Sequence, residues 1–387
     1  MGLRAAIIGA GQTRFGALPD GPRTLLRTAV DRAVASVDRG LDRGRIGTAF
    51  LATLGFGGWQ IGNAAALFAE EAGIPGVAAV RIENACASGG YALQAAVAAI
   101  TSGAADVALV AGLEKMTDVT SARRRYWLGV SGDTEWERQA GLTFAGVYGL
   151  IASRYLALHR VPPEALAEVA VKNHANGALN PNAHFQKEIS REGALAAPRV
   201  ADPLGLYDCC PVSDGAAAVL LASEEAARRY TDTPVYIDGL GAASDHLAVQ
   251  ERPEPTRFEA SRRAADAAFR AADCRPSDLS FAELHDCFTI AELLALEDVG
   301  LAGRGQAGAL TLSGATRRDG AIPVNPDGGL KAKGHPIGAT GVAQAVEVFL
   351  QLRGAAGARQ VARRDRALTH NVGGAGATAA VAIFRAG

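Results

Sequence analysis

Short apolar runs alternate along the chain with longer runs that have the periodicity of helices. The runs predicted as strands are residues 5–8, 47–53, 77–82, 106–111, 214–221 and 279–284. The runs predicted as helices are 22–37, 63–72, 87–102 and 289–299. Apolar runs of strand length between helical segments are typical of strands covered by helices. The pattern therefore predicts an α/β fold.

The alternation is interrupted between residues 115 and 200. This stretch is richer in charged and polar residues, contains Trp127 and Trp136, and has helical patterns at 141–159 and 163–176. A change of character over this length indicates an insertion into the alternating fold. We predict an inserted loop domain at 115–200.

A second alternating series begins near residue 234 and resembles the first. Residues 215–221 match 376–382 in character, and the helix that follows Cys86 is echoed by the helix that follows His335. A repeat of this size indicates a duplicated fold. The predicted N-terminal half is then 1–114 with 201–230, and the C-terminal half is 231–387. If a pseudo-twofold axis relates the halves, Cys86 and His335 face each other across one cleft.

Composition removes several classes of function. The 387 residues suffice for two or three domains, and a formal net charge of −1 gives no general attraction to nucleic acid or an anionic membrane. No uncharged stretch is long enough to span a bilayer, and the N-terminus lacks a signal-peptide pattern. Five cysteines without a C-x-x-C spacing predict neither a disulfide framework nor a zinc site. We expect a cytoplasmic protein without a metal.

Glycines near the N-terminus need a separate reading. Gly9 and Gly11 follow the first apolar run as the start of a dinucleotide fingerprint would, but Arg14 stands where the third glycine is required. We therefore predict a tight turn here and no nucleotide cofactor.

Cys86 is the first candidate for chemistry. It falls between the strand at 77–82 and a charge-free helix at 87–102, at the positive end of the helix dipole. That position favours the thiolate, which is the nucleophilic form of cysteine. The small residues at 87–90 would let a substrate carbonyl approach closely. The alternative is a buried structural cysteine.

Three other motifs lie at the ends of predicted strands. His285 and Cys287 follow the strand at 279–284, His335 lies in a glycine-rich loop at 325–341, and residues 370–376 join two C-terminal strands through a glycine turn. Each motif taken alone has a purely structural explanation. Because sites in α/β folds form where strands end, their coincidence predicts one functional site.

The segments 84–90, 285–288 and 334–336 resemble those of thiolases. More narrowly they resemble the sterol-carrier-protein-type and archaeal-type acetyl-CoA acetyltransferases, and the likeness extends to 171–174 and 209–215. The resemblance implies a duplicated thiolase fold, layered α-β-α-β-α, with an inserted loop domain.

The resemblance also implies a mechanism of acyl transfer. Cys86 would attack an acyl-CoA thioester while His335 takes the thiol proton. The backbone N–H groups of Cys86 and Gly373 would form an oxyanion hole. Coenzyme A is then a substrate, and no cofactor is implied.

A second acid/base is needed for the carbon–carbon bond. Ordinary thiolases use a cysteine at the position of Asn371, and asparagine cannot move this proton. The subfamilies named above use the cysteine two residues after a histidine, which is Cys287 here. His285 replaces an asparagine of ordinary thiolases and would stabilise the enolate oxygen together with His335. Cys287 also argues against the related ketoacyl synthases, which need no α-proton base.

Other roles implied by the resemblance concern binding. Ser213 and Lys333 are candidate substrate contacts, and the CoA phosphates call for basic residues. The basic candidates are Arg123, Arg124, Arg125, Lys172 and Lys187. A homodimer or tetramer is expected, and a small partner with an OB-fold and a zinc ribbon is a further possibility. Two alternatives to a thiolase remain: a C-acyltransferase acting on a non-CoA carbon acceptor, and a non-catalytic scaffold.

Overall fold

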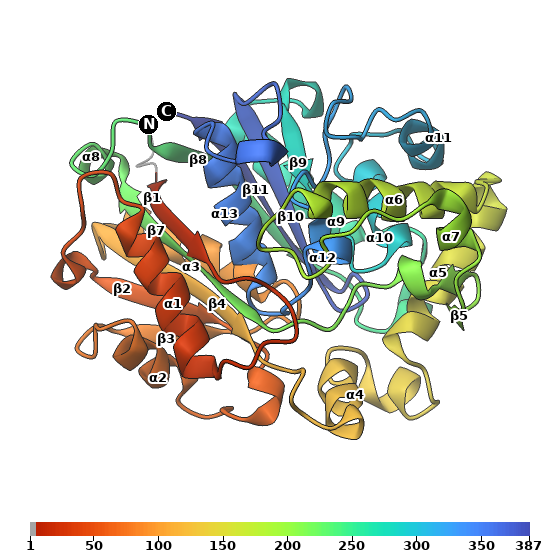
Figure 1. Ribbon diagram of the computed structural model, residues 1–387, viewed down its shortest axis with the longest axis horizontal. Helices are drawn as coiled ribbons and strands as arrows, with labels where there is room; N and C mark the ends of the chain where they lie inside the picture. Colours follow the sequence, from red (N-terminus) through yellow and green to blue (C-terminus); the bar gives the residue numbers. More distant parts are fainter. Residues whose placement is uncertain (1–4) are drawn as a thin grey trace.

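A nine-stranded sheet runs through the computed structural model, which describes residues 5–387 (Figure 1). Its strand order is β3-β2-β4-β7-β1-β8-β11-β10-β9. The strands of the first half are β1 (Ala5–Gln12), β2 (Thr48–Ala52), β3 (Ala79–Ile82), β4 (Val107–Glu114) and β7 (Gly215–Ser223). Those of the second half are β8 (Val235–Ser244), β9 (Phe281–Glu283), β10 (Arg366–Gly373) and β11 (Thr378–Ala386).

The strand order is mirrored about the junction of β1 and β8, which pair antiparallel. Outward from this junction, the strands are β1, β7, β4 and β2 in the first half and β8, β11, β10 and β9 in the second. In the large sheet, each series is the first strand of its half, the last strand, the strand before the last, and the second strand. The first half ends in β3, and at the corresponding edge of the second half Val324 forms an isolated parallel bridge with Ala282 of β9. The topology has the two copies expected of a duplicated fold.

Helices cover both faces of the strands. In β4, Ala108 and Val110 pack into one hydrophobic cluster while Leu109 and Ala111 pack into another on the opposite face. A strand buried on both faces needs apolar residues at every position, and this explains the continuous apolar runs.

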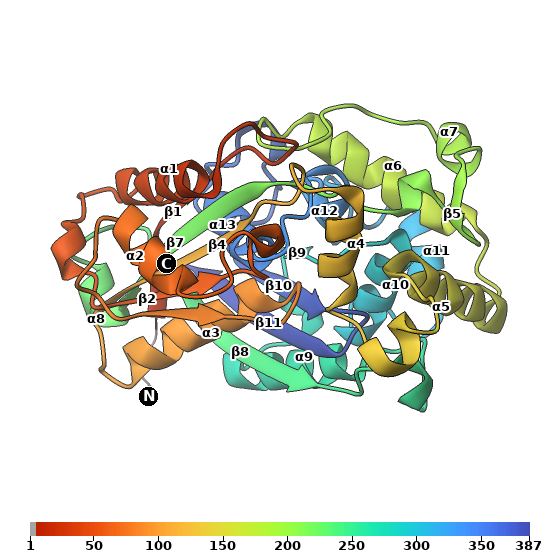
Figure 2. The same cartoon turned by 90° about the horizontal axis from the view of Figure 1, so that it is seen from below.

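Five layers result, as Figures 1 and 2 show. One outer layer contains α1 (Pro22–Ala35), α2 (Ala64–Glu71) and α8 (Glu224–Ala227), and the other contains α9 (Glu259–Ala272) and α10 (Thr289–Asp298). The middle layer, between the two halves of the sheet, is formed by α3 (Ser88–Thr101) and α13 (Thr340–Leu352). The predicted α-β-α-β-α layering is confirmed.

The predicted turn at Gly9 and Gly11 is wrong. Both residues lie inside β1, which continues to Gln12. A Cβ on Gly9 would lie 2.6 Å from the carbonyl oxygen of Ala33, and a Cβ on Gly11 would lie 2.4 Å from the nitrogen of Ala33. These glycines are required because α1 packs directly on the strand.

The stretch between β4 and β7 is mainly helical. It contains α4 (Ser121–Gly129), α5 (Phe144–His159), α6 (Glu164–Ala178), α7 (Arg191–Leu195) and the short strands β5 (Arg199–Ala201) and β6 (Leu204–Gly205). Helices α5 and α6 pack against α10, α11 (Ala307–Leu312) and α12 (Gly329–Ala332) of the C-terminal half. Among residues 5–387, no helix is long and apolar enough to cross a membrane.

Candidate active site

The N-terminal ends of α3 and α13 approach each other closely in the middle layer. A Cβ on Gly89 would lie 2.7 Å from the backbone nitrogen of Val342, and one on Gly341 would lie 2.5 Å from that of Gly90. The small residues after Cys86 therefore let the two central helices pack together. The sequence predicts that these residues admit a substrate carbonyl. In the structure, Gly89 and Gly90 lie where α3 and α13 pack against each other.

The turn that carries Cys86 is held by short hydrogen bonds. Ala85 adopts a left-handed conformation with φ 49°, which costs a non-glycine residue about 1–2 kcal/mol. The Ser88 hydroxyl accepts a hydrogen bond from the Asn84 N–H (2.9 Å) and donates one to the Ala85 carbonyl (2.6 Å). Strain that is held in this way is typical of functional sites.

His335 lies beside the sulfur of Cys86. Its Nε2 is 3.2 Å from Cys86 Sγ, and its Nδ1 is 2.7 Å from the hydroxyl of Thr340. That hydroxyl donates its proton to the carbonyl of Pro336 (2.9 Å), so it accepts from His335 Nδ1–H. The lone pair of His335 is therefore on Nε2 and points at the thiol.

The Cys86–His335 pair is uncharged at rest. Burial, together with the nearby Cys210, raises the pKa of Cys86 to about 12. Burial lowers the pKa of His335 to about 3. The expectation that the helix dipole favours the thiolate is therefore wrong for the resting protein, because loss of solvation outweighs it. The sulfur becomes a nucleophile only as its proton moves to Nε2.

His285 also lies near this sulfur. Cys86 Sγ and one ring nitrogen from each of His285 and His335 all lie within 4.8 Å of one another. The two rings are nearly perpendicular, at 86°, with centroids 5.2 Å apart. Nδ1 of His285 is 3.2 Å from Asn371 Nδ2, while Nε2 is buried without a hydrogen-bond partner among residues 5–387. Burial and the neighbouring His335 lower the pKa of His285 well below its usual value.

Cys287 shares a pocket with Cys86. The Tyr148 hydroxyl lies beside Cys287 and donates a hydrogen bond to the Gly374 carbonyl (3.1 Å). Burial, followed by the nearby Cys86, raises the pKa of Cys287 strongly, so this thiol is also protonated at rest.

The pocket has a volume of about 130 Å³ and a largely apolar lining. Besides the two cysteines and His335, it is lined by Met116, Leu128, Ser131, Phe144, Cys210, Pro211, Val212, Phe288, Ile337 and Gly374. The backbone N–H groups of Gly374 and of Cys86 itself act on the thiol by lowering its pKa, against the larger effect of burial. Gly373 is the last residue of β10.

Two predicted substrate contacts lie away from this pocket. Ser213 is 1% exposed, and its hydroxyl accepts a hydrogen bond from the His335 backbone N–H (3.3 Å). Lys333 is also 1% exposed and forms a buried ion pair with Asp327. Because both side chains are enclosed and already partnered, they support the His335 loop and do not meet a ligand in the pocket. This corrects the expectation.

The basic candidates divide in the same way. Lys172 is 3% exposed and ion paired with Glu292 (3.0 Å), so its charge is not available to a phosphate. Arg123 lies on α4, the helix whose Leu128 lines the pocket, and its guanidinium is 5.2 Å from the ring centre of Trp59. The remaining candidates, Arg124, Arg125 and Lys187, lie at least partly exposed.

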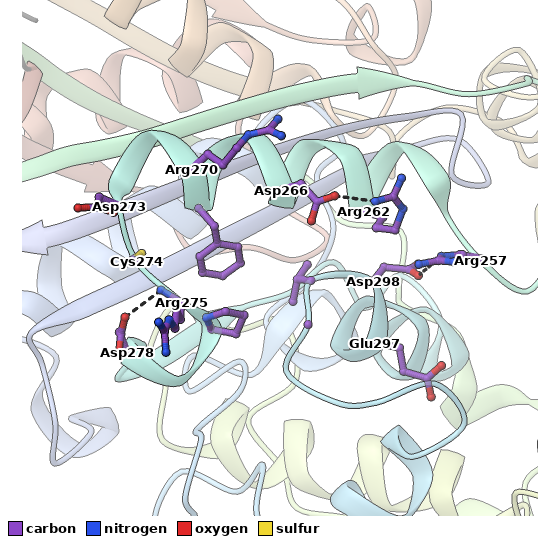
Figure 3. A pocket seen from close by; sticks show the side chains of 14 residues that line it. Arg257, Arg262, Asp266, Arg270, Asp273, Cys274, Arg275, Asp278, Glu297 and Asp298 are labelled. Atoms are coloured by element: carbon purple, nitrogen blue, oxygen red, sulfur yellow. Dashed lines mark hydrogen bonds and ion pairs between the residues drawn. The ribbon is translucent and has the colours of Figure 1, made fainter.

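A larger hollow lies elsewhere, and none of the motif residues lines it. It has a volume of about 920 Å³ and is formed by α9, the link to β9 and the end of α10 (Figure 3). Its charges are of both signs and pair with one another, as Arg262 does with Asp266 (2.6 Å). We therefore place the candidate active site at the smaller pocket, where the nucleophile and the base meet.

Sequence reasoning missed three side chains that shape this site. Thr340 orients His335, Tyr148 lies beside Cys287, and Cys210 is a third cysteine in the pocket. A hydroxyl residue at the first position of the helix after a histidine loop is a usable signal for Thr340. Nothing in the local sequence marks Tyr148, because it reaches the pocket only through the packing of α5.

Comparison with known proteins gives a consistent result. The family described as "Thiolase, N-terminal domain" matches residues 5–225, and "Thiolase C-terminal domain-like" matches residues 241–386. An acetyl-CoA acetyltransferase of Methanothermobacter thermautotrophicus is 44% identical over 381 residues, which is 98% of each chain. Human sterol carrier protein 2 is 34% identical over 335 residues, 81% of this chain and 60% of that protein. A solved aldolase assembly, Ltp2–ChsH2(DUF35), superposes with a TM-score of 0.87 at 25% identity and covers 99% of this chain and 98% of that one.

Proposed function

The chain belongs to the thiolase family, and on that premise we propose that it transfers acetyl groups between CoA thioesters through an acyl-Cys86 intermediate. The reaction is a reversible condensation of two acyl-CoA molecules, or the thiolysis of a 3-ketoacyl-CoA. The supporting observation is the 3.2 Å contact between Cys86 Sγ and the free lone pair of His335, with Cys287 in the same pocket.

The first step in the direction of cleavage is attack on the keto carbon. Cys86 adds to the carbonyl as its proton passes to His335 Nε2, the general base set by the Thr340 hydroxyl. The oxyanion beside the sulfur would be stabilised by the backbone N–H groups of Cys86 and Gly373. Gly373 adjoins Gly374, whose backbone N–H lowers the pKa of Cys86.

The second step breaks the carbon–carbon bond. The leaving enolate of acetyl-CoA places its oxygen at His285, and its carbon takes a proton from Cys287. The resting protonation state suits this step, because a thiol with a raised pKa is an acid that still carries its proton. Acyl-Cys86 and acetyl-CoA are formed.

The proton count closes when CoA enters. After cleavage His335 carries one extra proton and Cys287 lacks one. The Cys287 thiolate takes the thiol proton of CoA, the CoA sulfur attacks acyl-Cys86, and the departing Cys86 sulfur regains its proton from His335. Condensation is the same sequence in reverse, and no cofactor takes part.

The test uses two assays that separate the steps. Thiolysis is followed by the loss of the acetoacetyl-CoA enolate absorbance on addition of CoA. Acyl transfer alone is followed by exchange of labelled CoA into acetyl-CoA, which needs no carbon–carbon chemistry. Wild-type protein should perform both reactions and C86A neither. C287A should keep exchange, because there His335 takes the Cys86 proton and returns it to the departing CoA sulfur, while it loses about 10²–10⁴-fold in thiolysis.

The outcomes separate the alternatives. Exchange without thiolysis in the wild type would contradict a thiolase and favour transfer to a non-CoA carbon acceptor. Absence of both reactions, with Cys86 unreactive toward iodoacetamide, would favour a scaffold. Retention of full thiolysis by C287A would contradict the role given to Cys287.

Assembly is part of the proposal. The edge strand β3 ends close to Cys86, and Val80 on it is 48% exposed, which supports pairing of two copies along this edge. A smaller partner protein is supported by the Ltp2–ChsH2(DUF35) assembly. Light scattering of the purified chain, with V80K as the edge-disrupting variant, tests the first point, and co-purification tests the second.

The division of the chain is proposed on the same basis. Residues 115–200 form the inserted loop domain, and α4 within it brings Leu128 to the pocket wall and arginines to the surface nearby. We propose that CoA phosphates bind on this helix. An R123A/R124A/R125A variant should raise the KM for acetyl-CoA with little change in kcat.

A further inference from the structure

Asn371 lies among three groups that decide its orientation. Its Oδ1 accepts a hydrogen bond from the Gly90 N–H (3.0 Å), and its Nδ2 donates one to the Cys86 carbonyl (2.8 Å). A backbone N–H can only donate and a carbonyl can only accept. The amide therefore has one allowed orientation, because the flipped form would oppose a donor to a donor and an acceptor to an acceptor.

The fixed amide decides which nitrogen of His285 carries the proton. Nδ2 of Asn371 also faces His285 Nδ1 at 3.2 Å, and since Nδ2 is a donor, Nδ1 must accept. The proton of the neutral ring is then on Nε2. That atom is buried without a partner among the described residues. One ring nitrogen of His285 lies within 4.8 Å of Cys86 Sγ.

We propose that Asn371 is a positioning residue that locks His285 as an Nε2–H donor, so that the ring serves the substrate oxygen and cannot act as a metal ligand. This inference rests on the proposed function for the identity of the oxygen. It gives a role to a residue that replaces the usual second cysteine of thiolases and that takes no part in proton transfer.

The exclusion of metal is the second consequence of the same lock. One sulfur and two imidazole nitrogens within 4.8 Å of one another form a donor set of the kind that Zn²⁺ prefers. A metal needs a lone pair from each ligand, and His335 Nε2 offers one. His285 offers none from either nitrogen, because the lone pair of Nδ1 accepts from Asn371 and Nε2 carries the ring proton. The site thus keeps a reactive thiol between two histidines without a complete metal-binding set.

The test compares thiolysis by two variants, N371D and N371A. The order of their activities reverses if the role of Asn371 is only structural. N371D keeps the volume and the acceptor for Gly90 but presents an acceptor to His285 Nδ1, so the ring proton moves to Nδ1. N371A removes every contact and leaves the ring free to choose. A tautomer lock predicts that at pH 8 N371D is the poorer thiolysis enzyme, at least 10-fold below N371A. A structural role predicts that N371D is the better one.

Two further measurements are made on the same variants. In an H285A background the N371D substitution should change thiolysis less than 3-fold, because its effect passes through His285. Zn²⁺, buffered by a chelator and followed by loss of CoA exchange, should inhibit N371D at a concentration at least 10-fold lower than wild type. An undiminished effect of N371D in H285A, or equal Zn²⁺ inhibition, would overturn the proposal.

Nitrogen-15 NMR of histidine-labelled protein reads the tautomer directly, with H285A to assign the signal. The wild-type ring should carry its proton on Nε2. A proton on Nδ1 in a wild-type protein that performs thiolysis would overturn this inference alone. A proton on Nε2 in a protein that performs exchange but not thiolysis would leave the tautomer standing and reject the proposed function.

Discussion

The loops that carry His335 and His285 present the same side chain to one sulfur in opposite states. The His335 loop, before α13, supplies a hydroxyl acceptor, Thr340, to Nδ1. The His285 loop, after β9, meets an amide donor from Asn371 at Nδ1. Nε2 of the first ring is consequently an acceptor and Nε2 of the second a donor, although both rings are buried and neutral. A base and an oxygen-stabilising donor are thus made from one residue type by changing one neighbour.

The largest effect should follow removal of the acceptor ring. H335A leaves the Cys86 thiol, with its raised pKa, without a base, so every reaction that begins at the sulfur is affected. We expect thiolysis and CoA exchange to fall together, by about 10³–10⁴-fold. Both assays on one preparation measure this, with C86A as the floor. Exchange that survives in H335A would show that another group accepts the thiol proton.

Removal of the donor ring should have a smaller effect, confined to one reaction. H285A leaves the Cys86–His335 contact in place and removes only the donor for the enolate oxygen. Thiolysis should fall by about 10²–10³-fold while exchange changes little. H285N is the matched control, because an amide also offers a donor at this position. Equal losses of both reactions in H285A would erase the distinction between the two loops.

The positions of Cys86 and His335 could be predicted from the sequence. The runs that became β4 and β7 read as strands because both of their faces are buried, and Cys86 and His335 stand at the start of the two helices that fill the middle layer. The duplication of the fold predicts that Cys86 and His335 face each other. The sequence therefore predicts that the starts of these two helices lie close together.

The protonation state and the hydrogen-bonding role of each group could not be predicted from the duplication. The thiolate expected at Cys86 came from the local helix dipole, whereas the raised pKa comes from burial by elements distant in sequence. The N–H group that donates to Asn371 Oδ1 belongs to Gly90, 281 positions away, so the role of this amide depends on how β10 and α3 are placed against each other. Ser213 and Lys333 likewise stand in motifs that point to a site, yet both are buried behind it.

A smaller effect should follow loosening of the His335 tautomer. T340V keeps the shape of the side chain but removes the acceptor of Nδ1–H, so part of the population places its proton on Nε2 and loses the base. One neutral hydrogen bond is worth about 1 kcal/mol, and we expect about a 5-fold loss in both assays. T340S restores a hydroxyl and should recover most of the activity. A selective loss of thiolysis would instead assign Thr340 to the enolate step.

The smallest difference between the loops should appear in their response to pH. Burial holds the pKa of His335 at about 3 and that of His285 well below its usual value, so neither ring titrates between pH 6 and pH 8. Each unfolded histidine takes up a proton below about pH 6.5 while the folded one does not. A depressed pKa of this kind contributes stability that is complete above the unfolded value and is lost as pH falls toward the folded one. Urea unfolding at pH 7 and pH 5 should therefore show reduced acid sensitivity in both H335A and H285A, by up to about 2 kcal/mol for H335A. If only one variant lost acid sensitivity, the other ring would be charged in the folded protein, and a charged ring donates from both nitrogens whatever its neighbour.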